Sequence, residues 1–530
     1  MKRALVTAMA AALLAACAPA GEPRPGAVVS TDAGPVRGVL AEEYRLFQGI
    51  PFAAPPVGEL RWRPPQPVQR WSQPRDATEP GGVCAQVASP VADIASESED
   101  CLYLNVLAPD SAVPLPVMVW IHGGGGTNGA GSYFDAHRLA LGGDVVVVTI
   151  NYRLGVFGAF GYPGLPGSGT FGLADQQAAL GWVQRNIAAF GGDPGNVTVF
   201  GESFGAYAAT AQLTSPGARG LFHRVALQSG LALHDYPPGM IVPGSPAVPS
   251  LWISSAELAG LGSSVAAELG CADPATALEC LRRRPARDLL PVTSIFTRYA
   301  YGTDALPDDP VAALRAGRFH RVPVISGATR DEHRLYAAAF YDLAGRPITP
   351  QSYAQLLAEA FGPAAGRVAA RYPLEAYESP SLAWSAVGTD RLWALATAEQ
   401  NRLLAAHVPT YAYEFADRAA PPTVRFPPGF PPGAYHSAEV FYQFDESGTG
   451  EFGATAGEFT PAQRRLAEQL NSYWANFART GDPKTPGLPP WPAFGPGAPH
   501  VQSLAPAPTG IHPVDYSAEH HLPFWRALLP

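Results

Sequence analysis

Short apolar runs rich in β-branched residues recur along the chain and alternate with longer segments of helical character. Such runs, bounded by glycine or polar turns, are typical of strands buried within a parallel sheet. They lie within residues 117–126, 144–155, 196–200, 224–230, 322–332 and 410–418. Between the second and third runs, residues 175–192 have amphipathic spacing and end near Gly191, which suits a helix C-cap. The pattern predicts an α/β protein with a mostly parallel central sheet flanked by helices.

The third run leads directly into a serine that stands between two glycines. In the sequence VTVFGESFGAYAA, Gly201 and Gly205 lie two residues either side of Ser203, and alanine-rich sequence of helical character follows. Glycines at these places permit a turn so tight that it displays the serine hydroxyl. Because the chain contains 55 glycines, the pattern alone also fits a turn without chemistry. Ser203 is therefore a candidate nucleophile that needs partners.

Two later runs carry candidate partners just beyond their ends. Asp331 and Glu332 follow the run that begins at residue 322, and His436 lies in the loop after the run at 410–418. In an open α/β sheet, reactive groups gather beyond the carboxyl ends of the strands. The chain order serine, carboxylate, histidine is the order of an α/β-hydrolase.

Composition restricts the class of protein further. The chain has 530 residues, is 47% hydrophobic and has a net charge of −9 without any basic run. A nucleic-acid partner calls for a basic face, so we expect none. The length alone allows two or three domains.

The N-terminus predicts export from the cytoplasm. Lys2 and Arg3 precede the uncharged stretch 4–16, which is too short for a stable membrane-spanning helix. Residues 14–17, Leu-Ala-Ala-Cys, resemble the lipobox of bacterial lipoproteins, in which the cysteine is lipidated. We therefore expect a signal peptide at 1–17, a tether at 18–28 and a cell-envelope lipoprotein. The alternative is a secreted protein cut nearby, with Cys17 lost or idle.

The remaining cysteines are expected to form structural disulfides, because export permits them. Four cysteines allow three pairings, and proximity in the sequence favours Cys84 with Cys101 and Cys271 with Cys280. Their spacing is not that of a zinc site, and we expect no metal and no cofactor.

Ordered blocks over nearly the whole chain after the tether give a resemblance to a known family. These blocks include FQGIPFAAPPVGELRW, SEDCLYLNV, WIHGGG, NYRLGVFG, GLADQQAALGWVQRNIAAFGGDPGNVTVFGES, RDE and YWANFARTGDP. With them the chain resembles the type B carboxylesterases, which include bacterial p-nitrobenzyl esterases, animal carboxylesterases and cholinesterases. The resemblance implies an α/β-hydrolase fold in one catalytic domain, residues 29–530, with large insertions that form a cap over the active site. It also implies hydrolysis of small-molecule carboxylic esters through an acyl-enzyme.

The resemblance assigns the reacting residues. It makes Ser203 the nucleophile, His436 the base and later acid, and Glu332 the carboxylate that orients His436. Neighbouring Asp331 and His333 are the competing candidates for that third role. For His407, His520 and His521 we expect structural roles.

The glycine run and several further positions also match the family. The amides of Gly124, Gly125 and Phe204 would form the oxyanion hole. Glu202 and Ser229 match positions that organise the site without reacting, and both cysteine pairs match family disulfides. Three residues depart from the pattern: Phe204 where alanine is common, Gly126 where an aromatic is common, and His333 where glycine usually follows the acid. We expect catalysis to survive, with pocket volume moved from one wall to the other.

Two other functions stay open at this level. A lipase or polyester hydrolase is favoured if residues 233–255 form a mobile apolar lid. A non-catalytic binding protein on the same fold is the alternative from another class, although this chain keeps all three triad residues. Acyl and alcohol specificity and oligomeric state are not predicted, because variable loops form pocket walls.

Overall fold

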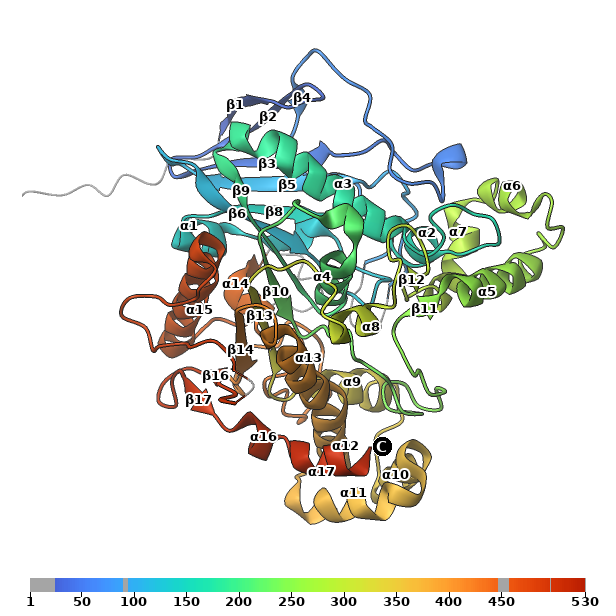
Figure 1. Ribbon diagram of the computed structural model, residues 1–530, viewed down its shortest axis with the longest axis vertical. Coiled ribbons are helices and arrows are strands. Elements are labelled where there is room, and N and C mark those ends of the chain that lie inside the picture. The colour runs from blue at the N-terminus through green and yellow to red at the C-terminus, as the bar shows by residue number, and fades with distance from the viewer. Residues whose placement is uncertain (1–23, 89–93, 447–456, 496, 530) are drawn as a thin grey trace, which may run out of the picture.

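One large twisted sheet forms the centre of the protein (Figure 1). The computed structural model describes residues 24–88, 94–446, 457–495 and 497–529; the predicted signal peptide, Cys17 and tether residues 18–23 lie outside them. In spatial order the strands of this sheet are β1 (Arg24–Ser30), β2 (Pro35–Leu40), β3 (Tyr44–Pro51), β5 (Tyr103–Pro109), β8 (Val146–Ile150), β6 (Leu115–Ile121), β9 (Gly192–Glu202), β10 (Arg224–Gln228), β13 (Val324–Thr329), β14 (Thr410–Phe415), β16 (Val501–Leu504) and β17 (His512–Val514), and β4 (Arg75–Asp76) pairs with β2.

The strands from β8 to β16 pair in parallel, whereas the flanking strands β1, β2, β3 and β5 and the edge strand β17 pair antiparallel. All six predicted strand segments lie in the parallel block, so the prediction of a mostly parallel central sheet is confirmed. The first strand corrects the predicted tether, because residues 24–28 belong to β1. Pro25 and Gly26 made this segment look like a linker, but an edge strand tolerates them through a bulge between Pro25 and Ala27.

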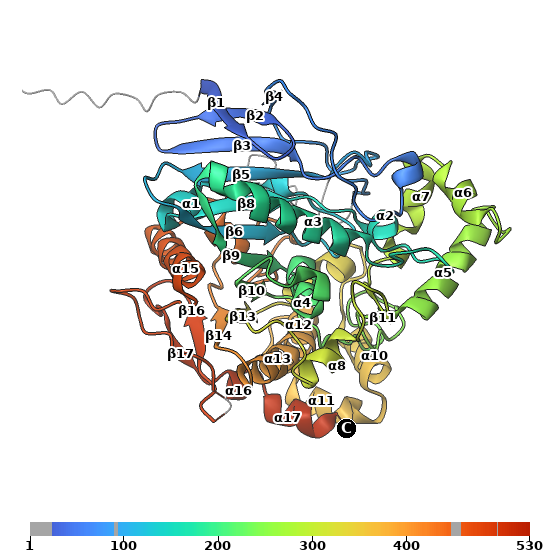
Figure 2. The ribbon, with the colours of Figure 1, turned by 45° about the horizontal axis from the view of Figure 1, so that its top comes forward.

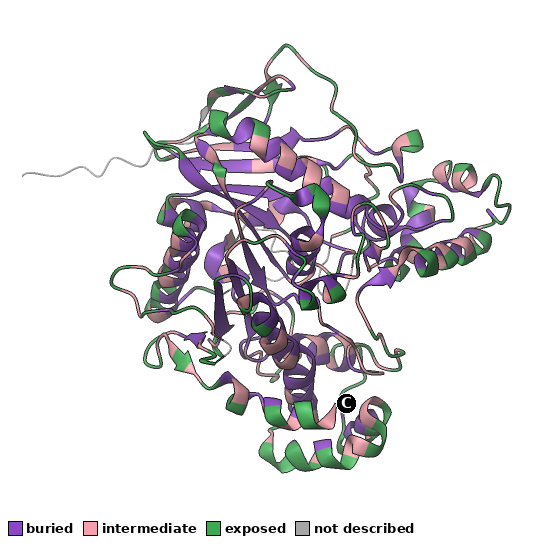
Figure 3. Cartoon of the chain, in the orientation of Figure 1, coloured by how far each residue is buried: buried purple, intermediate pink, exposed green. Residues whose placement is uncertain are grey.

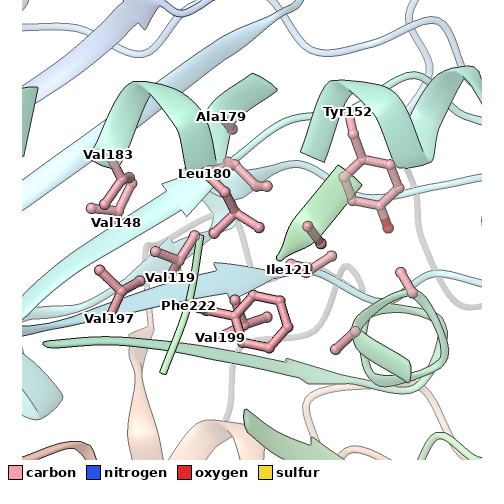
Figure 4. Close-up of a cluster of buried hydrophobic side chains, with 14 of the residues drawn as sticks. Val119, Ile121, Val148, Tyr152, Ala179, Leu180, Val183, Val197, Val199 and Phe222 are labelled. Atoms are coloured by element: carbon pink, nitrogen blue, oxygen red, sulfur yellow. The ribbon is translucent and has the colours of Figure 1, made fainter. Parts of the chain in front are cut away.

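Alternating side chains of the strands bury both faces of the sheet under helices. On β6, Val119 and Ile121 point to one face, while Met118 and Trp120 point to the other. Figure 4 shows the first face, where Val119, Val197 and Val199 lie near Leu180 and Val183 of helix α3. The helices on that face are α3 (Phe171–Asn186), α4 (Phe204–Thr214), α8 (Pro310–Arg315) and α13 (Leu395–Ala405), and those on the other are α1 (His137–Gly143), α14 (Val440–Gln443) and α15 (Pro461–Thr480).

The predicted helix at 175–192 is present but begins earlier. Helix α3 starts at Phe171 and continues into a 3₁₀ turn, Ile187–Phe190. Gly191 ends it in the left-handed conformation, with φ of 88°. The cap was predictable from the sequence, whereas the start was not, because the first turn is apolar on all sides.

Two groups of helices extend beyond the sheet and confirm the predicted insertions (Figure 2). One group comprises α2 (Gly155–Ala159), α5 (Ser255–Glu268), α6 (Ala277–Arg282) and α7 (Ala286–Leu289), with the short strands β11 (Ile253–Ser254) and β12 (Ala300–Tyr301). The other comprises α9 (Arg334–Ala337), α10 (Pro350–Phe361), α11 (Ala365–Arg371), α12 (Pro380–Gly388), α16 (Tyr516–Glu519) and α17 (Leu522–Leu528), with the π-helical turns η6 (Ala338–Asp342) and η9 (Thr389–Ala394). In Figure 3 the central strands are buried, while α10 and α11 expose their outer faces.

Two disulfides and a small two-stranded sheet complete the framework. Cys84 is bonded to Cys101 and Cys271 to Cys280, as the spacing favoured. Strands β7 (Phe134–Asp135) and β15 (Asp445–Glu446) pair with each other. Among the described helices none has both the length and the apolar character needed to cross a bilayer.

Candidate active site

Ser203 occupies the sharp turn between strand β9 and helix α4. Its backbone has φ of 54°, a left-handed value that is strained for a residue with a side chain. A Cβ atom at Gly205 would lie 1.9 Å from the carbonyl oxygen of Ile121, and one at Gly201 would lie 2.7 Å from the same atom. Glycine is therefore required on both sides, because β9 and α4 pass so close to β6 that no side chain fits.

Three loops bring a serine, a histidine and a carboxylate together. His436 lies after β14, and its Nε2 is 2.8 Å from the Ser203 hydroxyl oxygen. Its Nδ1 is 2.5 Å from Oε2 of Glu332, which follows β13. The other oxygen of Glu332 accepts a hydrogen bond from the backbone N–H of Thr329 at 2.8 Å, which fixes the carboxylate. Glu332 is fully buried and His436 is nearly so.

The two neighbours of Glu332 point elsewhere. Asp331 accepts hydrogen bonds from the guanidinium group of Arg418, both at 2.9 Å, and from the backbone N–H of Ala434. His333 is buried, with its Nε2 2.9 Å from the carbonyl oxygen of Met240. Neither side chain hydrogen-bonds to His436, so each has a structural position.

The glycine run lies beside the serine and presents backbone amides. Gly124, Gly125 and Gly126 all have left-handed backbones, with φ of 96°, 62° and 73°. No hydrogen bond to another described residue is made by the N–H of Gly124 or of Gly125. Phe204 is the first residue of α4, where an N–H group has no acceptor within the helix. These amides can receive a negatively charged oxygen.

A cavity of about 510 Å³ opens onto the serine. Besides the residues above, its lining includes aromatic and aliphatic side chains from helix α4, from the segment between β10 and β11, and from the insertion that contains α9, η6 and η9. They are Tyr207, Leu231, Tyr236, Ile241, Val242, Leu251, Leu335, Tyr336, Phe340 and Trp393. Across the described part of the chain no group of three or more His, Cys, Asp or Glu side chains is arranged to hold a metal ion.

A model of the carboxylesterase family matches residues 25–525. The chain belongs to this carboxylesterase family. It is similar to a cocaine esterase of Oryctolagus cuniculus, with 35% identity over 505 residues covering 88% of this chain and 90% of that one. It is 34% identical over 476 residues to the para-nitrobenzyl esterase of Bacillus subtilis, covering 88% and 92%. A solved structure of a thermophilic PNB esterase superposes with a TM-score of 0.77 at 31% identity, covering 94% of this chain and 99% of that one.

These relationships establish the fold and the class of reaction. The fold is that of the α/β-hydrolases, and the carboxylesterase is a serine hydrolase of carboxylic esters with small-molecule substrates. The prediction from the sequence is confirmed at this level.

Carboxylates dominate the electrostatics around His436. Oε1 of Glu202 lies 3.2 Å from His436 Nε2 and also accepts a hydrogen bond from the Ser437 hydroxyl at 2.7 Å. Burial alone would lower the pKa of His436, but Glu202 and Glu332 outweigh it and raise the pKa to about 9. Burial raises the pKa of Glu202 itself to about 7. The carboxylesterase site therefore stabilises the imidazolium form of His436.

A further carboxyl group, which sequence reasoning missed, lies behind this pair. Glu439 is fully buried, and its Oε1 is 3.5 Å from the Ser229 hydroxyl and 3.4 Å from the Tyr413 hydroxyl. Burial raises the pKa of Glu439 to about 8, and the charges of Glu202 and Glu332 add to the effect. Ser229 thus contacts Glu439, whereas Glu202 contacts His436 and Ser437. The signal was present in the sequence HSAEVFY, where one acidic residue stands in an apolar stretch three positions after His436.

Aromatic rings that support His436 were also missed. The ring of Trp393, on η9, lies 4.7 Å from that of His436, and the ring of Tyr336 lies 5.3 Å away. His234 packs on Trp393, and its burial lowers its pKa to about 3, so it stays neutral. These side chains come from distant insertions, and no spacing in the sequence links them to the triad.

Proposed function

We propose that Ser203 attacks the ester carbonyl carbon while His436 accepts the hydroxyl proton at Nε2. Glu332 holds the Nδ1 proton, fixes the tautomer and stabilises the imidazolium. His436 then gives its proton to the leaving alcohol, and an acyl-enzyme forms on Ser203. Water, deprotonated by the same histidine, then attacks the acyl carbon; the bond to Ser203 Oγ breaks, His436 returns the proton to Ser203 Oγ, and the acid leaves as a carboxylate. The observation that carries this proposal is the continuous contact from Ser203 Oγ through His436 to Glu332, at 2.8 and 2.5 Å.

The glycine amides complete the reaction cycle. In each tetrahedral intermediate the former carbonyl oxygen carries negative charge, and the N–H groups of Gly124, Gly125 and Phe204 are proposed to bind it. Glycine lets the chain come close to that oxygen, because no side chain intervenes. Glu202 and Ser229 organise the surroundings of His436, directly and through Glu439, without bonding to the substrate.

The lining of the cavity indicates the type of ester. It is mainly apolar and aromatic, so an ester with an aryl or benzyl part would bury that part against rings. The names of two relatives, a para-nitrobenzyl esterase and a cocaine esterase, fit this choice. We propose aryl and benzyl esters of short acids as the preferred substrate class.

Product partitioning tests the acyl-enzyme. With methanol present, p-nitrophenyl, phenyl and benzyl butyrate should each give the same ratio of methyl butyrate to butyrate, because all three pass through one butyryl-Ser203. Ratios that differ between leaving groups would show that no common acyl-enzyme forms.

The segment suggested as a lipase lid is anchored in the structure. Asp235 forms an ion pair with Arg391, and the carbonyl oxygen of Leu251 accepts a hydrogen bond from Tyr207 at 2.7 Å. Trp252 donates to the carbonyl oxygen of Ala232 at 2.9 Å, and a bridge joins Tyr236 to Val248. These contacts favour a fixed pocket wall and thus an esterase. Activity on tributyrin should therefore rise smoothly through the solubility limit, whereas a jump there would identify a lipase.

We also propose that the enzyme is exported and lipidated on Cys17. The support is the sequence alone, namely the charged start, the short apolar stretch and the Leu-Ala-Ala-Cys motif. In a bacterium with the lipoprotein pathway, the wild type should partition into detergent and Cys17→Ser should not. Equal partitioning, with a mature N-terminus beyond residue 17, would show simple secretion instead.

A further inference from the structure

The ring of Phe204 fills the space directly over Gly126. A Cβ atom at Gly126 would lie 2.7 Å from each of two ring carbons of Phe204, closer than real Cβ atoms approach. In this arrangement any side chain at residue 126 would therefore clash with the aromatic ring at residue 204. The aromatic side chain at 204 and the glycine at 126, two separate departures in the sequence, form one coupled feature of the pocket.

Phe204 is backed by a fixed set of aromatic rings. Its ring lies 5.2 Å from that of Tyr207 and 5.3 Å from that of Tyr299. Tyr207 stacks on Trp252 at 4.1 Å and is tied by its hydroxyl to the carbonyl oxygen of Leu251. Phe204 lines the cavity and is half-buried, so one side of its ring faces the substrate space.

A second aromatic wall belongs to His436. The rings of Tyr336 and Trp393 contact His436, and the ring of Phe340 lies 6.3 Å from that of Tyr336. Within the described residues, no ring contact joins this set to the set that contains Phe204. The cavity thus has one wall on the side of the base and another at the start of helix α4.

Reaction geometry assigns the two parts of an ester to these walls. The tetrahedral carbon bonds to Ser203 Oγ, to the oxyanion, to the leaving oxygen and to the acyl chain. The leaving oxygen must take its proton from Nε2 of His436, so the alcohol part lies along the wall of His436. The acyl chain is the substituent that remains for the other wall. We propose that Phe204 closes the acyl side of the pocket and limits the length of the acid that the enzyme accepts, an inference that rests on the proposed roles of Ser203 and His436.

Two substrate series test the assignment. Replacement of Phe204 by alanine should raise the ratio of kcat/KM for p-nitrophenyl octanoate over acetate by about tenfold or more, since one methylene group is worth that much in a filled pocket. The ratio for 2-naphthyl acetate over phenyl acetate should change by less than about twofold, because only the alcohol differs. Phe340→Ala removes the same side chain from the other wall and should leave the octanoate ratio as in the wild type. An unchanged octanoate ratio in Phe204→Ala, or a change confined to the alcohol series, would overturn the proposal.

A double-mutant cycle tests the contact itself. Gly126→Ala should lower kcat/KM by about tenfold or more, because the new methyl group displaces the Phe204 ring. In the double variant with Phe204→Ala, most of that loss should be restored. Gly164 has the same φ of 73°, but a Cβ atom added there would meet nothing within 4 Å, so Gly164→Ala reproduces the backbone strain alone. Additive effects of Gly126→Ala and Phe204→Ala would show that the two positions are independent.

Labelling with an organophosphonate separates this proposal from the catalytic one. If Ser203 is labelled stoichiometrically in every variant and the octanoate ratio stays fixed, the proposal for Phe204 fails while the triad stands. If the adduct lies on another residue, the triad assignment fails first.

Discussion

Oε1 of Glu202 lies 3.2 Å from Nε2 of His436, the nitrogen that also contacts Ser203. The histidine thus has a carboxylate beside each ring nitrogen, because Glu332 contacts Nδ1. Both negative charges favour the imidazolium form, which the reaction creates and then consumes. We therefore expect Glu202 to act on the proton affinity of the base and not on the substrate.

Replacing Glu202 should move the pH profile in a defined direction. Glu202→Gln keeps the size of the side chain but removes a charge that raises the pKa of His436. His436 then loses its proton at lower pH, so the acidic limb of the kcat/KM profile should move to lower pH by about one pH unit. The measurement is kcat/KM for p-nitrophenyl butyrate from pH 5 to 10, with exposed Glu257→Gln as control. An unmoved or upward-shifted limb would contradict this role.

The third member of the triad is tested by neighbouring variants. Glu332→Gln leaves His436 without the carboxylate on Nδ1, and the corresponding loss in a serine protease is on the order of 10⁴ in kcat. Asp331→Asn should cost about tenfold or less in kcat and instead lower Tm, because it weakens the ion pair with Arg418. His333→Ala should behave like Asp331→Asn. Circular dichroism checks that each variant is folded. If Asp331→Asn loses most of kcat while Glu332→Gln stays active, Asp331 and not Glu332 is the carboxylate that orients His436.

The sequence predicted those parts of the site that depend on local geometry. Gly201 and Gly205 indicate the turn at Ser203, because no side chain fits beside them. Gly191 marks the end of the 3₁₀ turn that continues α3, because its backbone is left-handed. Six of the seven strands from β8 to β16 were predictable as continuous apolar runs, since both of their faces are buried, whereas β16, with the sequence VQSL, was not. The strands β1, β2 and β3 were not, because many of their residues are partly exposed and because they contain Pro25, Gly38 and Gly49.

Contacts over long sequence distances account for what the sequence did not predict. Trp393 reaches His436 through the π-helical turn η9, and Tyr336 reaches it from α9. No periodicity in the sequence indicates that these two residues contact His436. The steric exclusion between Gly126 and Phe204 likewise needs the distance between a loop and a helix, which a resemblance in sequence does not supply.

His520 links the C-terminal helices to the wall of the pocket. Its Nδ1 is 2.6 Å from Asp390 on η9, and its Nε2 is 2.6 Å from Glu414 on β14. Burial alone would lower the pKa of His520, but hydrogen bonds to the two carboxylates raise it to about 9. Arg330 also forms an ion pair with Glu414.

A pKa that is higher in the folded state makes protonation of His520 stabilising. The contribution is complete below pH of about 6.5, the unfolded value, and is lost as the pH rises through about 9. His520→Gln should therefore lower Tm clearly at pH 6, and the gap to the wild type should shrink by pH 10. Thermal unfolding at both pH values measures this. A gap that grows with pH would contradict the charged state assigned to His520.

A covalent probe shows which residue is the nucleophile. The wild type is treated with a fluorophosphonate ester and digested, and the modified peptide is identified by mass spectrometry. We expect one adduct, on Ser203, that appears in parallel with loss of esterase activity and is absent from Ser203→Ala. An adduct on any other residue, or labelling and hydrolysis that persist in Ser203→Ala, would contradict it.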